Sequence, residues 1–213
     1  MFAQPVNTLS SVAYLLAGAW IVWRGVRAPG RRVELTVFGL VVASNAVGGL
    51  LFHGVQTAGA RWAHDACLLA VMAFIVAFDV GRLRERSTAW TMRVFARSLV
   101  AIGLLTLWGG AMYALATLLG VAVGVFELAE YRHEIPAFRA EGFTARRLAR
   151  LGALAALALG GTAFWIGRSG APFCDPPSAM QWHAVWHALT AAAMALYAYA
   201  LIEPHPSAVS RSA

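Results

Sequence analysis

Two histidines stand four residues apart near the start of the last apolar segment, in the run QWHAVWH at residues 181–187. An α-helix has about 3.6 residues per turn, so His183 and His187 are predicted to lie one turn apart on a single face. Two imidazoles in this arrangement can chelate a metal ion such as Zn²⁺. The pair predicts part of a metal site whose other ligands come from distant segments.

A catalytic zinc usually has three protein ligands and an open position for water. His53, at the end of the apolar run GLLFH (residues 49–53), is the predicted third ligand, because an imidazole in apolar surroundings needs a polar partner. His64 competes with it, and we expect His64 beside the site or on the surface. Asp65 has three explanations: it orients or deprotonates a water on the zinc, it binds the metal directly, or it stabilises the first turn of a helix.

The segments that carry these residues are apolar enough to lie in a membrane. The chain has 213 residues, of which 60% are hydrophobic, and its mean hydropathy is +0.64. Such a chain is too apolar for an ordinary soluble domain of this length. We predict an all-α, integral membrane bundle of seven transmembrane helices. The predicted spans cover residues 8–23, 34–53, 63–80, 92–108, 111–127, 148–166 and 181–202.

The distribution of arginine decides the number of helices, since residues 99–126 would otherwise also fit one long helix. Short cytoplasmic loops collect Lys and Arg. The chain has no Lys, and with seven helices Arg61 and Arg168 lie on one side while the other fifteen arginines lie on the opposite side. Joining the fourth and fifth helices would destroy this bias. We therefore predict the N-terminus outside, the C-terminus in the cytoplasm, and the histidines and Asp65 at the outer face.

We expect one transmembrane domain at residues 1–203, followed by a short disordered cytoplasmic tail at 204–213. No positive charge precedes the first apolar segment, which therefore predicts a retained helix rather than a signal peptide. The net charge of +7 comes from arginines in short loops, a pattern that favours anionic lipid headgroups over nucleic acid as the partner. Neither Cys67 nor Cys174 has an expected partner, so no disulfide is predicted.

Three acidic residues at cytoplasmic helix ends are expected to meet arginines: Asp79 with Arg82 or Arg84, and Glu127 and Glu130 near Arg132. We expect no second ionisable cluster in the cytoplasmic half of the bundle. A proton or metal transporter would need such a cluster, because its ion path must continue through the bilayer. A transporter is therefore less favoured than a protein that binds metal at the outer face.

The residues resemble the alkaline-ceramidase branch of a membrane-hydrolase superfamily that includes adiponectin-type receptors and haemolysin-III-like proteins. The family has Ser-x-x-x-His near the end of helix 2, an Asp at the start of helix 3 and His-x-x-x-His in helix 7. Residues 49–53, Asp65 and the pair His183 and His187 occupy these places. The run NTLSS at residues 7–11 also resembles the Asn-Thr-x-Ser-Asn run that opens helix 1 in alkaline ceramidases.

The resemblance implies that His53, His183 and His187 bind zinc and that Asp65 assists the attacking water. The implied activity is hydrolysis of an amide bond in a lipid such as ceramide. The alternative is a non-catalytic, zinc-binding membrane protein of receptor-like or structural type. The Ala-rich composition, with Arg as the basic residue, suggests a bacterial protein, and the predicted location is the inner membrane.

The chain departs from the family pattern at two positions. Gly49 stands where the family has its serine, which removes a donor that would stabilise the reaction intermediate. Amide hydrolysis would then need another donor, such as a water or a group of the outer loop, and the loss also fits the non-catalytic alternative. Gln4 stands where a calcium-binding Glu would be expected, so we predict no calcium site.

Overall fold

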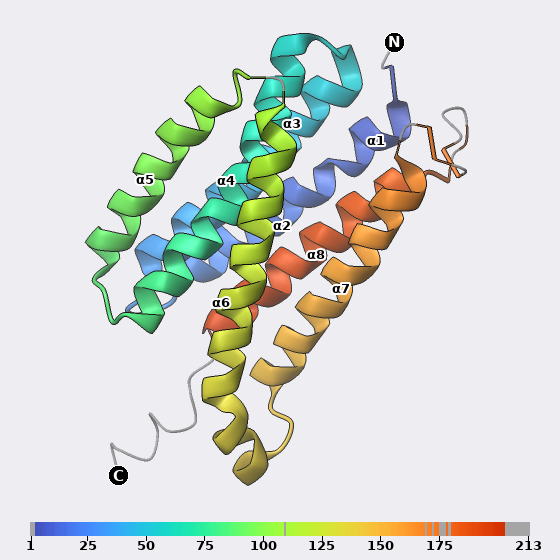
Figure 1. Ribbon diagram of the computed structural model, residues 1–213. Helices are drawn as coiled ribbons and strands as arrows, with labels where there is room; N and C mark the ends of the chain where they lie inside the picture. The colour runs from blue at the N-terminus through green and yellow to red at the C-terminus, as the bar shows by residue number, and fades with distance from the viewer. Residues whose placement is uncertain are drawn as a thin grey trace.

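The computed structural model describes residues 3–108, 110–168, 170–171, 173–174, 178 and 180–202, and these form eight α-helices without a strand. The helices are α1 (Pro5–Ser10), α2 (Val12–Gly25), α3 (Arg32–Val55), α4 (Ala58–Leu83), α5 (Thr88–Leu105), α6 (Ala111–Glu141), α7 (Ala145–Gly167) and α8 (Trp182–Ile202). Figure 1 shows them as one elongated bundle. The tail predicted at 204–213 lies outside the described residues.

Seven helical stretches of the described chain are long and apolar enough to cross a membrane, and α1 and α2 together form the first. Large apolar side chains are exposed on the outside of the bundle, as on α6, where Tyr113, Leu118 and Val121 are each more than half exposed. Water would disfavour a continuous apolar surface of this kind, whereas lipid is its natural surrounding. The predicted all-α, seven-span architecture is confirmed.

The fourth and fifth spans are separate helices. α5 ends at Leu105 and α6 begins at Ala111, and the two run in opposite directions from a connection at one end of the bundle (Figure 1). α6 continues to Glu141, well beyond the predicted end at residue 127. Charged residues leave a helix intact, and this helix ends only where Gly142 adopts a positive φ of 68°, a conformation that favours glycine after a helix.

The third span begins five residues before its predicted start. Gln56 adopts a left-handed φ of 54°, which ends α3, and the Thr57 hydroxyl accepts a hydrogen bond from the Ala60 amide at 3.2 Å to cap α4. The prediction that Asp65 opens this helix is therefore wrong, since Asp65 lies two turns inside α4. The stabilising field of a helix N-terminus is confined to the first turn, so it does not explain this carboxylate.

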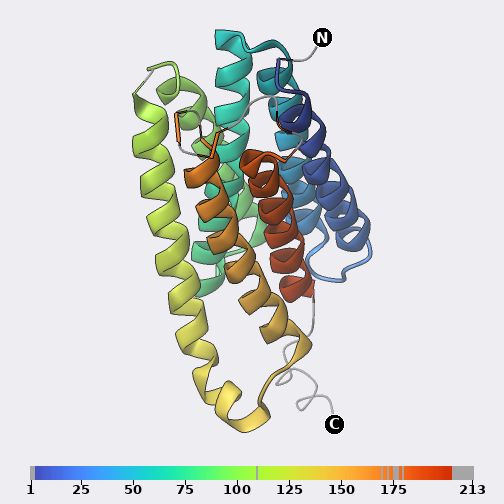
Figure 2. The ribbon, with the colours of Figure 1, turned by 90° about the vertical axis from the view of Figure 1, so that its right-hand side faces the viewer.

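The helices pack in pairs that bring distant parts of the chain together. α2 lies along α3 and α7 lies along α8, while α2 also packs on α8 and α4 packs on α3, α5 and α6 (Figures 1 and 2). α2 and α3 approach each other so closely that a Cβ atom at Gly18 would lie only 2.5 Å from the Gly39 carbonyl oxygen. The core includes Phe38, which stacks on Phe74 at 5.1 Å and meets Tyr197 edge-on at 5.7 Å.

α1 and the C-terminal end of α8 lie at opposite ends of the bundle, as Figure 2 shows. The end that holds α1 also holds the α3–α4 connection and the start of α8. The other end holds the α2–α3 and α4–α5 turns. The two ends therefore carry different residues.

Candidate metal centre

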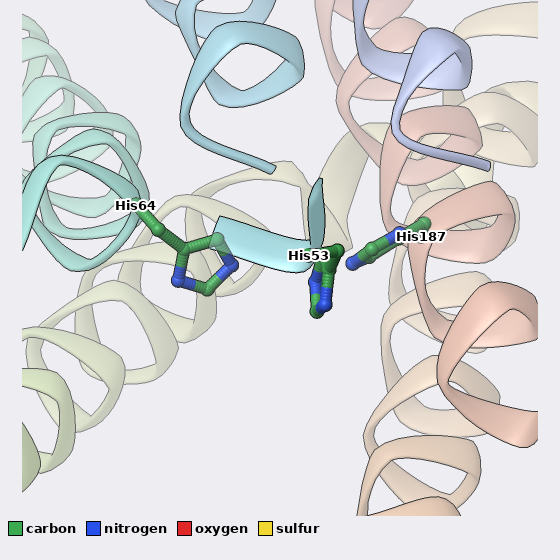
Figure 3. Close-up of side chains that lie close together, drawn as sticks. All are labelled: His53, His64 and His187. Atoms are coloured by element: carbon green, nitrogen blue, oxygen red, sulfur yellow. The ribbon is translucent and has the colours of Figure 1, made fainter. Parts of the chain in front are cut away.

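Four histidines from three helices meet at the end of the bundle that holds α1. His53 lies in the last turn of α3, His64 lies in α4, and His183 and His187 lie in the first two turns of α8. One ring nitrogen each of His53, His64 and His187 lies within 4.8 Å of the other two. Figure 3 shows His53 between the other two rings. His53 and His187 are each only 2% exposed.

His183 belongs to the same cluster. Its ring centroid lies 4.9 Å from that of His53 and 4.8 Å from that of His187, and the His53 and His187 centroids are 5.2 Å apart. The His64 centroid is slightly farther from His53, at 5.6 Å. The structure thus brings the three predicted ligands together and places His64 beside them. Their assignment as zinc ligands stays a prediction.

The hydrogen bonds of His53 define which of its ring nitrogens is free. Its Nδ1 lies 2.7 Å from Oε1 of Gln4, and the same oxygen accepts a bond from the Asn7 side-chain amide at 3.0 Å. An amide oxygen only accepts, so Nδ1 of His53 carries the proton and Nε2 keeps its lone pair. That Nε2 atom is buried without a hydrogen-bond partner among the described residues.

His187 is oriented in a similar way by Ser10. The Ser10 hydroxyl donates to the Asn7 carbonyl oxygen at 3.0 Å, so its oxygen is left to accept from Nδ1 of His187 at 2.8 Å. The lone pair of His187 then also lies on Nε2. Metal-binding histidines commonly donate their second nitrogen to a neighbouring acceptor in this manner, which fixes ring orientation and tautomer.

The residues fit a metal ion such as Zn²⁺. Nε2 of His183, like that of His53, is buried without a hydrogen-bond partner in the described structure. A buried polar atom without a partner costs about 1–3 kcal/mol, and a metal ion bound by both nitrogens would remove that cost. Neutral imidazole nitrogens are common zinc ligands, and three of them make a catalytic set.

Asp65 lies at the edge of the cluster and contacts His64. Its Oδ1 accepts from Nδ1 of His64 at 3.0 Å, and both side chains are 22% exposed. The carboxylate therefore fixes the His64 ring, leaving the other nitrogen of that ring with a lone pair. Partial exposure leaves the pair accessible to water, which an acid–base role requires.

Two glycines of α3 set the packing around the site. A Cβ atom at Gly48 would lie 2.9 Å from Cα of His64, so this glycine lets α4 approach α3 closely enough to present His64. A Cβ atom at Gly49 would lie 2.3 Å from Oγ of Ser11 and 2.8 Å from its Cβ. Ser11 is fully buried and thus occupies the space that a side chain at position 49 would fill.

The N-terminal segment supplies groups that the sequence did not predict as parts of the site. The amides of Ala3 and Gln4 donate to the carbonyl oxygens of Gly54 and His53, at 3.1 and 3.0 Å, so this segment is anchored on the end of α3. From there Gln4 and Ser10 contact His53 and His187, and Ser11 lies beside Gly49. The run NTLSS was the available signal, but it does not show which hydroxyl meets which histidine.

A second group of ionisable residues lies buried toward the other end of the bundle, contrary to expectation. Asp79 is fully buried and accepts a hydrogen bond from the Tyr197 hydroxyl at 2.8 Å rather than forming the predicted ion pair. Arg82 pairs with Glu130 at 2.9 Å. Arg150 of α7 lies 3.7 Å from carboxylate oxygens of both Glu127 and Glu130.

The predicted charge pairing of Glu127 and Glu130 is confirmed, but their partners are Arg82 and Arg150 rather than the expected Arg132. Arg132 lies on the exposed side of α6, whereas the two glutamates face α4 and α7. Hydropathy places such residues near a membrane boundary, but it does not show that carboxylates and guanidinium groups from three helices meet there. The expected absence of a second ionisable cluster is wrong.

Comparison with known proteins found no matching family model and no matching curated protein. The resemblance to the alkaline-ceramidase family rests on the histidines, on Asp65 and on the run at residues 7–11.

Gln4 is predicted to support metal binding through His53. Replacing Gln4 by Ala should weaken zinc affinity about 10- to 100-fold, because His53 loses the acceptor that fixes its tautomer and orientation. Gln4→Glu keeps an acceptor oxygen and should retain most of the affinity. Competition against a fluorescent chelator measures both, with the remote Thr117→Ala as control. Equal affinities for Gln4→Ala and the unaltered protein would remove Gln4 from this role.

Proposed function

We propose that this chain is a zinc-dependent membrane hydrolase that cleaves an amide bond in a lipid, as a ceramidase does. The observation that carries the proposal is the cluster of His53, His183 and His187, in which two buried Nε2 atoms have no partner among the described residues. Zn²⁺ bound there would activate a water and polarise the scissile carbonyl. The three histidines hold the metal, and α3 and α8 position them.

Asp65 and His64 act together in proton transfer in this proposal. The carboxylate holds Nδ1 of His64, so Nε2 of His64 can accept a proton from the attacking water while Asp65 stabilises the resulting imidazolium. The leaving amine must receive a proton when the amide bond breaks, and the same pair can return it. Their partial exposure supports this role, since protons must exchange with solvent.

Ser11 supplies the hydroxyl that Gly49 lacks in this proposal. The Ser11 hydroxyl lies where a side chain at position 49 would be, one helical turn before His53. It now donates to the Asn7 carbonyl oxygen at 2.9 Å. Rotation about its Cα–Cβ bond would redirect that proton to an oxygen that gains negative charge during the reaction. The departure at Gly49 is thus compatible with catalysis.

The proposed orientation places the histidine cluster at the outer face of a bacterial inner membrane. Arginines gather at the other end of the bundle, which is the end that the positive-inside rule assigns to the cytoplasm. The N-terminus then lies outside and the C-terminus inside. The lipid substrate reaches the metal from the outer leaflet.

A structural zinc site is the second candidate function, and the position of His64 favours it. Its ligand nitrogen lies within 4.8 Å of those of His53 and His187, and the His183 ring contacts both of the latter rings. Four protein ligands would close the coordination sphere and leave no position for water. The protein would then be a receptor-like or structural relative without hydrolase activity.

A transporter is less favoured, although a second ionisable cluster exists. Asp65 and Asp79 are separated by 14 residues of α4, about 21 Å along the helix axis. Leu69 and Phe74 lie between them, and both are buried in the apolar core with exposed fractions of 0% and 1%. An ion or proton path along α4 would have to cross this apolar stretch.

Metal content is the first prediction to test. Elemental mass spectrometry of the detergent-purified protein should find about one zinc per chain, and His53→Ala and His183→Ala should each lose it. His64→Ala separates the two candidate functions. It should keep its zinc if three histidines form an open site, and lose much of it if four form a closed one. A protein that binds no metal when reconstituted with zinc would contradict both functions.

Asp65→Asn should keep zinc and lose turnover. Asn retains the shape and an acceptor oxygen but has no negative charge, so hydrolysis of a ceramide should fall by about 10²- to 10⁴-fold. Mass spectrometry of the released fatty acid measures turnover, and Glu85→Gln, at an exposed position far from the cluster, is the matched control. Turnover equal to that of the control would exclude Asp65 from the mechanism.

A hydroxyl swap between Ser11 and Gly49 tests the proposed donor. Ser11→Gly should retain zinc but reduce turnover by about 10²- to 10³-fold, because a donor to the developing charge is lost. Gly49→Ser alone should lower thermal stability, since its Cβ meets Ser11. Combining the two changes puts the hydroxyl on α3 and should recover stability and part of the turnover. Full activity in Ser11→Gly would rule out this role, with Ser98→Ala as control.

A further inference from the structure

A cavity of about 620 Å³ opens at the end of the bundle opposite the histidine cluster. Five arginines from four separate segments line it: Arg24 at the end of α2, Arg27 and Arg31 in the α2–α3 turn, Arg82 at the end of α4 and Arg146 at the start of α7. Its other lining residues include Trp23, Leu201 and Ile202, and none of the described lining residues is acidic.

We propose that this cavity binds the phosphate group of an anionic lipid, with the phosphate among the arginines and the apolar chain along Trp23, Leu201 and Ile202. This inference is independent of the histidine cluster and of the proposed hydrolase activity. It assigns a second site, with a different chemistry, to the other end of the molecule.

Aromatic side chains contact three of the guanidinium groups that line the cavity, those of Arg27, Arg31 and Arg82. Arg27 lies 4.8 Å above the Trp23 ring and donates to the Trp23 carbonyl oxygen at 2.9 Å. Arg31 and Arg82 lie 5.6 and 5.8 Å from the centre of the same ring, that of Phe78. Such contacts orient an arginine but leave its full positive charge. Arg27 and Arg31 are thus oriented by aromatic rings, which leave their charge intact, whereas Arg82 also pairs with Glu130.

The Arg31 guanidinium lies near another guanidinium group as well as near carboxylates. Burial and the neighbouring Arg82 guanidinium both lower the pKa of Arg31, while Glu34 and the more distant Glu130 act in the opposite direction. Both carboxylates have other partners: Glu34 accepts a hydrogen bond from Thr88, and Glu130 pairs with Arg82. A bound anion would relieve the repulsion between Arg31 and Arg82.

A phosphate on an amphiphile fits these walls better than other anions do. Guanidinium groups bind phosphate through paired, charge-assisted hydrogen bonds, and several can share one phosphate. Trp23 is 49% exposed and lies beside the cavity, where an acyl chain could pack. Helix ends rich in arginine lie at the depth of lipid headgroups in a membrane. The cavity volume is also that of a small-molecule site rather than of a single ion.

Lipid binding by the purified protein tests this proposal. Native mass spectrometry of the full chain, titrated in detergent with phosphatidylglycerol or with zwitterionic phosphatidylcholine, gives an apparent Kd for each lipid. Arg24→Gln combined with Arg31→Gln should weaken phosphatidylglycerol binding about tenfold or more, because charge-assisted bonds are lost. The control combines Arg93→Gln with Arg97→Gln, which removes the same charge from exposed positions on α5.

Loss of binding in the cavity variant but not in the control supports the proposal. Equal weakening in both variants would show a diffuse attraction to positive charge and would overturn it, as would unchanged binding in the cavity variant. Inorganic phosphate is titrated in a separate experiment. If it binds as tightly as phosphatidylglycerol, the lipid part of the proposal is wrong.

Zinc content and thermal unfolding of each variant check that the rest of the protein is intact. If the double variant does not fold, Arg27→Gln takes its place, since Arg27 is an exposed turn residue whose loss leaves the helices unchanged. Unchanged zinc content together with weakened lipid binding would separate the cavity from the histidine cluster. A failure of the hydrolase proposal would leave this result unaffected.

Discussion

Burial of two imidazoles, those of His53 and His187, in an apolar bundle constrains the architecture of one end of this protein. A ring nitrogen removed from water must find a partner, and the bilayer offers none. The N-terminal segment provides that partner to His53 and His187 through Gln4 and Ser10. This requirement explains why the segment pairs with the end of α3 and why the first helix is interrupted at Ser11.

Buried polar groups at the two ends of the bundle have different kinds of partners. At the histidine end, neutral rings are satisfied on one side by hydrogen bonds and keep lone pairs on the other. At the arginine end, full charges meet one another, as in the contacts among Arg82, Glu130 and Arg150, and aromatic rings contact the guanidinium groups of Arg27 and Arg31. An apolar core that includes Phe38 and Phe74 separates the two ends.

Hydropathy and the placement of arginine were enough to predict seven helices and the convergence of their histidines. The helices follow from the long apolar stretches, and the convergence follows from the side of the membrane on which each loop lies. Helix ends were predicted less well. α4 begins at Ala58 because of a local cap by Thr57, and α6 runs to Glu141 because no residue before Gly142 stops it. Caps and continuations of this kind depend on backbone angles, which an apolar pattern does not encode.

Residue spacing and topology predicted only the histidines of the candidate site. Spacing placed His183 and His187 on one face, and topology brought His53 to them. The sequence provided no information on Ser11, whose hydroxyl lies beside Gly49, or on Tyr197, the partner of Asp79. These two contacts join helices that are far apart in the sequence. That the Ser11 hydroxyl occupies the space beside Gly49 can be recognised only in the three-dimensional structure.

The bond between Ser10 and His187 joins residues that are 177 positions apart. During translation, α1 and α3 therefore enter the membrane before α8 exists, and His53 meets the rings of His183 and His187 only when this last helix arrives. The site cannot capture a metal with its full ligand set in a partly made chain. Under the proposed function, metal loading is therefore a late event in biogenesis.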